Sequence, residues 1–66
     1  MKDEDVMNEI SALCIRYAEM YMAERAVKNC EDMSNYEILV KGFNINKELF
    51  LEQYNKVETL VKSQIK

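Results

Sequence analysis

Almost nothing in this chain would interrupt a helix, since its 66 residues include no proline and a single glycine, Gly42. A β-sandwich or barrel needs many chain reversals, which depend on those two residue types. The composition, 48% apolar and 32% charged, also differs from that of a disordered linker. We therefore expect one small all-α domain spanning residues 1–66.

The N-terminal part of the chain has the periodicity of a long helix, from about residue 3 to 31. Apolar side chains recur there at steps of three, four or seven, which places them on one helix face: Val6, Ile10, Leu13, Tyr17, Met20 and Val27. Asp3, Glu4 and Asp5 occupy the predicted first turn and Lys28 lies near the last, as the helix dipole favours.

A second helix is predicted to begin near Asn35. Ser34 and Glu37 have the spacing of a capping box, and Met33 and Ile38 the spacing of a hydrophobic staple. Because so few residues separate the two periodic segments, the chain should reverse into an antiparallel helical hairpin.

Gly42 leaves two interpretations of the returning arm. We favour a short second helix, about 35–41, that ends at Gly42, with Asn46 capping a third helix at about 47–65. The alternative is one helix from 35 to 66, supported by a heptad pattern that only Lys47 interrupts. If the hairpin folds about residues 33 and 34, residue i of the first arm should face residue 67 minus i, which places Tyr17 against Phe50 and Leu13 against Tyr54. A bulge at 42–46 would shift these pairs by a residue or more.

The first helix carries more apolar surface than one neighbouring helix can cover. Six further side chains widen its apolar arc to roughly 240° at 100° per residue: Met7, Cys14, Ile15, Ala18, Tyr21 and Met22. Either the third segment folds over them or a second chain does, and an exposed patch on a monomer is the third possibility. We favour a dimeric helical bundle with these six residues at its interface.

Charge is unevenly distributed along the chain. Residues 1–40 contain four basic and nine acidic side chains, whereas residues 41–66 contain five and three. The two arms of the hairpin therefore attract each other, and two subunits packed head to tail would do the same, although most of these charges are expected simply to face water.

The two cysteines are expected to be reduced and largely buried. Sixteen helical residues would separate Cys14 from Cys30 by ~24 Å, too far for a disulfide. Two distant thiols and no histidine do not form a closed metal site, so no metal or cofactor is predicted. The acidic start of the sequence lacks the features of a signal peptide, and we expect a cytoplasmic protein.

These features favour a non-enzymatic protein–protein interaction module, such as an adaptor, chaperone or inhibitor, that forms a homodimer and binds a further protein partner. One alternative is a helix-turn-helix-like DNA-binding regulator, which the net charge of −3 disfavours. Another is a small-ligand site between subunits, near Tyr17, Tyr21 and Arg25. No catalytic motif is present, and no apolar segment approaches the ~20 residues of a membrane span.

Overall fold

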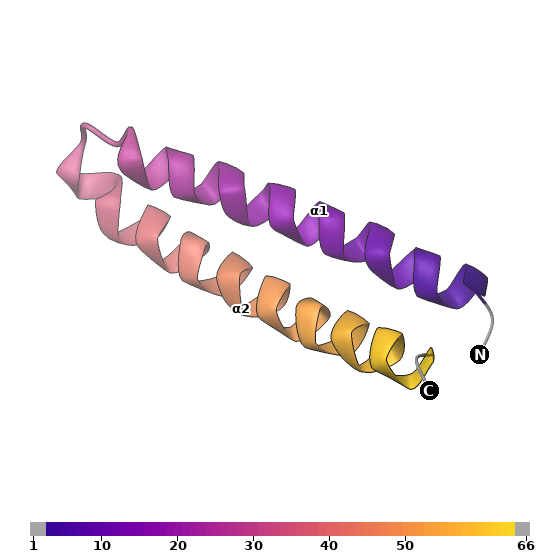
Figure 1. Ribbon diagram of the computed structural model, residues 1–66. Helices are drawn as coiled ribbons and strands as arrows, with labels where there is room; N and C mark the ends of the chain where they lie inside the picture. Colours follow the sequence, from indigo (N-terminus) through magenta and orange to yellow (C-terminus); the bar gives the residue numbers. More distant parts are fainter. Residues whose placement is uncertain (1–2, 65–66) are drawn as a thin grey trace.

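The structure is a computed structural model that describes residues 3–64. It consists of two antiparallel helices, α1 (Asp3–Lys28) and α2 (Met33–Gln64), lying side by side as a hairpin (Figure 1). The molecule is a rod of 50 × 14 × 12 Å. The predicted all-α helical hairpin is therefore confirmed.

The two helices face each other through rows of partly buried side chains. In α1 one such row repeats every seven residues, as in a coiled-coil seam, and all its members are half-buried: Val6, Leu13, Met20 and Val27. The facing surface of α2 has two rows with the same repeat: Leu39, Asn46, Gln53 and Leu60, and beside them Phe43, Phe50 and Val57. Val57, still 9% exposed, is the one hydrophobic residue that is buried among those described. The hairpin is thus two layers thick and has almost no interior.

The connection between the helices differs from the prediction, because the capping residue is Asp32 rather than Ser34. Asp32 Oδ1 accepts hydrogen bonds from the Ser34 backbone N–H at 3.0 Å and from Ser34 Oγ at 2.7 Å. A helix that starts at Met33 needs its cap just before it, outside helical geometry. The first helix is also shorter than predicted, since α1 ends at Lys28 and not near residue 31.

The expected staple is not formed either, because Met33 and Ile38 are both exposed. The loop instead uses Cys30, whose thiol donates a hydrogen bond of 3.1 Å to the Asp32 carbonyl.

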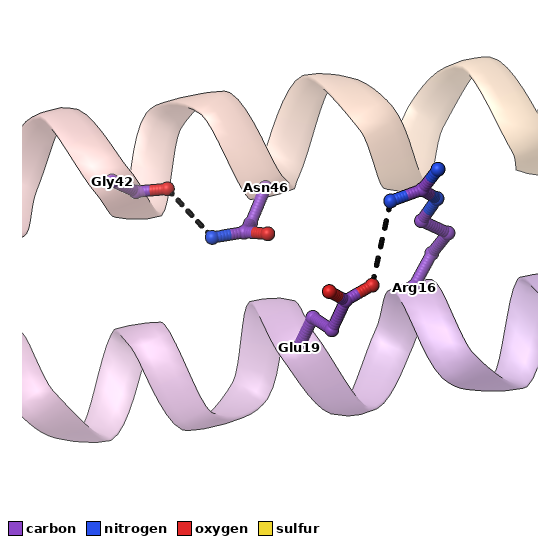
Figure 2. Close-up of polar contacts among 4 residues, drawn as sticks. All are labelled: Arg16, Glu19, Gly42 and Asn46. Atoms are coloured by element: carbon purple, nitrogen blue, oxygen red, sulfur yellow. Dashed lines mark hydrogen bonds and ion pairs between the residues drawn. The ribbon is translucent and has the colours of Figure 1, made fainter.

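The predicted break at residues 42–46 is wrong, and so is the division of the returning arm into helices at 35–41 and 47–65. The helix α2 runs without interruption through Gly42, whose φ is not positive. The side chain of Asn46 points toward α1, and its Nδ2 donates to the Gly42 carbonyl oxygen at 2.8 Å (Figure 2). Asn46 therefore bonds backward within a helix and does not cap a new one. Residue 65, the last of the predicted third helix, lies outside the described part.

The predicted pairing of the two arms is confirmed at its centre. The ring centroids of Tyr17 and Phe50 lie 5.8 Å apart, as expected from the 67-minus-i rule. Leu13 and Tyr54, the next predicted pair, line the same groove.

Candidate interaction surface

All six residues predicted as an interface are exposed. Met7, Ile15 and Met22 retain 59%, 62% and 71% of their possible exposure. We call this set the outer face of α1: Met7, Cys14, Ile15, Ala18, Tyr21 and Met22. Met7, Cys14 and Tyr21 each directly follow a residue of the row that faces α2, which turns them about 100° away from it. Ile15, Ala18 and Met22 lie farther round, on the side of α1 that points away from α2.

The fold leaves no segment within residues 3–64 that covers this outer face. One interpretation of the sequence had a third helix fold across it. That interpretation is wrong, because the returning arm is a single helix, α2, which lies along the opposite side of α1 (Figure 1). The exposure also corrects the expectation of largely buried thiols, since Cys14 is exposed and only Cys30 is partly covered; both thiols are free.

A second apolar surface, the aromatic side, runs along one flank of the hairpin. Tyr17 stacks on Tyr21 with ring centroids 6.4 Å apart, and Phe50 contacts both Tyr17 and Tyr54. A groove beside these rings, of about 280 Å³, is lined mainly by Leu13, Tyr54, Val57 and Val61. Tyr21 belongs both to this side and to the outer face, so the two surfaces are continuous.

The opposite flank, the polar side, carries the polar contacts between the helices. Lys56 Nζ lies 2.6 Å from Glu9 Oε2. Gln53 Nε2 donates to Glu9 Oε1 and also to the Glu9 carbonyl oxygen, both at 3.0 Å. The hydrogen bond from Lys56, followed by that from Gln53, lowers the pKa of Glu9. This cluster fixes the alignment of the two arms on one flank only.

The other ion pairs of the described residues each lie within a single helix. Arg16 and Glu19 of α1 approach to 3.4 Å (Figure 2). Lys28 pairs with Glu24 at 3.0 Å and Lys62 with Glu58 at 3.4 Å. Exposed pairs of this kind contribute little to stability. The attraction between the arms, expected from their charges, is thus carried by Glu9 and Lys56.

The three residues suggested as ligand contacts do lie together. The Arg25 guanidinium carbon is 5.9 Å from the centre of the Tyr21 ring, and Tyr21 stacks on Tyr17. This arrangement is a cation–π contact next to a stacked pair. It forms an exposed ridge, since Tyr17 and Tyr21 are 52% and 47% exposed. Residues 3–64 also contain no group of three or more Cys, Asp or Glu side chains placed to hold a metal ion.

Two parts of these surfaces were not singled out from the sequence. The cluster of Glu9, Gln53 and Lys56 was missed, although residues 9 and 56 nearly satisfy the pairing rule and have opposite charges. The aromatic side was recognised only as separate apolar pairs. The signal that would have found it is the clustering of Tyr17, Phe50 and Tyr54 on one flank once the hairpin is closed.

Comparison with known proteins finds no matching family model, no similar curated protein and no similar solved structure. None of the helices within residues 3–64 combines the length and apolar character that crossing a membrane requires.

Proposed function

We propose that this protein is a non-enzymatic protein–protein interaction module that forms a homodimer through the outer face of α1. The observation that carries the proposal is the exposure of all six residues of that face in a hairpin that buries only Val57 among its described residues. The apolar arc of α1, roughly 240°, is much wider than the stripe of about 100° that a helix needs to pack against one neighbour.

The accessible surface supports this proposal quantitatively. The hairpin exposes 5369 Å², whereas a compact monomer of its mass, 7.8 kDa, would expose about 4,400 Å². The excess of about 1,000 Å² is close to the roughly 800 Å² that each partner buries in a standard interface. A second copy would remove the excess surface in one step.

The elongated shape of the hairpin supports the same proposal as its excess accessible surface. The Cα radius of gyration is 15.2 Å, while a globular domain of this length would have about 11 Å. Two helices bury only the strip of side chains between them. Helical proteins normally build a stable core from three or four helices packed together. Dimerisation would supply the missing helices.

Two alternatives have less support. A helix-turn-helix DNA-binding protein needs a turn before its recognition helix, and α2 continues through Gly42 without a turn. A small-ligand site needs a concave pocket, and the contact of Arg25 with Tyr21 forms an exposed ridge instead.

Two matched isoleucines test the proposal. Ile15 on the outer face of α1 is 62% exposed, and Ile45 on α2 is 58% exposed. Because both are equally accessible in the hairpin, glutamate at either position should be tolerated similarly by a monomer. We expect Ile15→Glu to shift sedimentation from dimer toward monomer and Ile45→Glu to leave the dimer intact. Equal behaviour of the two variants would contradict the use of this face.

A further inference from the structure

The outer face of α1 has matching chemistry on either side of its midpoint. Any stripe on a helix is symmetric in position about some point, so symmetry of position alone carries no information. About a point between Cys14 and Ile15, however, Met7 corresponds to Met22 and Ser11 to Ala18. In these two pairs a large side chain matches a large one and a small side chain a small one, whereas Tyr21, at the edge of the outer face, corresponds to Asn8.

The ends of the same stripe have opposite charges. Glu4 lies in the first turn of α1 and corresponds to Arg25 in the last, on the same side as Met7 and Met22 at 100° per residue. Both are exposed, and neither forms an ion pair within the part of the chain that the structure describes. A cation and an anion at mirrored positions are what a self-complementary surface requires.

Other alignments lose these matches. Shifting the midpoint by one heptad step in either direction leaves either Met7 and Glu4 or Met22 and Arg25 without counterparts. A shift of about half a turn toward the N-terminus instead places Glu4 opposite Met22 or Tyr21. The midpoint between Cys14 and Ile15 retains the matches of Met7 with Met22 and of Ser11 with Ala18, and it pairs Glu4 with Arg25.

We infer that the second copy packs antiparallel on the outer face of α1, with its twofold axis between Cys14 and Ile15 and with Glu4 of each copy beside Arg25 of the other. This inference rests on the proposed function and adds the orientation and register of the dimer. The two α1 helices occupy the centre and each α2 lies outside, which suits the broad apolar surface of α1 and the more amphipathic character of α2.

The two cysteines provide a direct measure of this geometry. Packed helix axes lie 8–10 Å apart, so the two Cys14 thiols, offset by only ~1.5 Å along the axes, face each other closely. The two Cys30 thiols, at opposite ends of the dimer, are separated by ~46 Å. In a parallel dimer, by contrast, both pairs of thiols would lie at matching levels.

The experiment uses two single-cysteine variants of the full chain, Cys30→Ser and Cys14→Ser, treated with a short bismaleimide crosslinker. Serine at position 30 keeps a donor for the Asp32 carbonyl, which Cys30 now contacts at 3.1 Å. The inference predicts covalent dimers from Cys30→Ser, which retains Cys14, and none above background from Cys14→Ser. Sedimentation of both variants before treatment shows whether each is dimeric.

The remaining outcomes separate the two proposals. Crosslinking of both variants would establish a parallel dimer, and crosslinking of neither in a dimeric sample would place the contact on another surface, such as the aromatic side. Either result overturns the inference and leaves dimerisation intact. Sedimentation as a monomer overturns dimerisation itself.

A charge exchange provides an independent test of the register. Glu4→Arg and Arg25→Glu should each weaken the dimer, by a few-fold for every exposed pair affected. Because each substitution places like charges together across the twofold axis, the double variant should recover the dissociation constant of the original chain. Additive weakening in the double variant would contradict the pairing of Glu4 with Arg25.

Discussion

The rings of Tyr17 in α1 and Phe50 in α2 lie 5.8 Å apart, centroid to centroid, with their planes inclined by 59°. This tilted contact joins the centres of the two helices on the flank opposite the cluster of Glu9, Gln53 and Lys56. Aromatic pairs in such geometry stabilise beyond their buried area.

Replacement of Phe50 should therefore destabilise the hairpin. We expect Phe50→Ala to lower the free energy of unfolding by about 2 kcal/mol, less than a fully buried ring because Phe50 is half-buried. Urea unfolding followed by circular dichroism at 222 nm measures the change. Ile45→Ala, at an exposed site on the same helix, is the control, and an equal loss in both variants would contradict the role of the ring pair.

The cluster around Glu9 should make stability depend on pH. The folded chain lowers the pKa of Glu9 below its ordinary value near 4.5. Folding therefore favours the carboxylate, so its contribution is fully present above that value and disappears as pH falls through the lowered pKa. Glu9→Gln should remove this part of the acid dependence.

The measurement compares unfolding free energies between pH 7 and pH 3. The difference between the original chain and Glu9→Gln should shrink as pH falls below about 4.5, the ordinary value for Glu9. Asp32, whose pKa is lowered by its bonds with Ser34, contributes equally to both proteins. Glu52→Gln, at an exposed position, is the control. A constant difference at every pH would contradict the coupling of Glu9 to Lys56 and Gln53.

Gly42 lies inside a regular helix, so alanine at this position should stabilise the protein. A Cβ at this position would meet nothing within 4 Å, and the backbone φ is not positive. We expect Gly42→Ala to raise the free energy of unfolding by about 1 kcal/mol, from the difference in helix propensity. If the helix broke at this residue in solution, the same substitution would destabilise the protein.

Asp32 should determine where α2 begins. Asp32→Ala removes the acceptor for the Ser34 backbone N–H, and it should lower the melting temperature, whereas Asp32→Asn retains most of the bond. Thermal unfolding by circular dichroism compares these variants with Glu31→Ala, an exposed neighbour in the same loop. An equal effect of Glu31→Ala and Asp32→Ala would show that the cap is unimportant.

Periodicity was sufficient to predict the antiparallel hairpin and its central pairing, as the contact of Tyr17 with Phe50 shows, but not the number of helices, since the favoured division of the returning arm was wrong. Local capping signals were less informative, because Asn46 has the same side chain whether it caps a helix or bonds back to Gly42. The two states differ only in the tertiary context, here a continuous partner helix. The same limit explains the missed cluster of Glu9, Gln53 and Lys56, which depends on which flank of the closed hairpin each residue occupies.

The most direct test of dimerisation through the outer face of α1 is the mass of the full chain in solution. Sedimentation equilibrium over the micromolar range should give about twice the chain mass of 7.8 kDa, and the melting temperature should rise with protein concentration, as linkage requires for a folded dimer. A single species of 7.8 kDa at all concentrations, with a melting temperature independent of concentration, would contradict it.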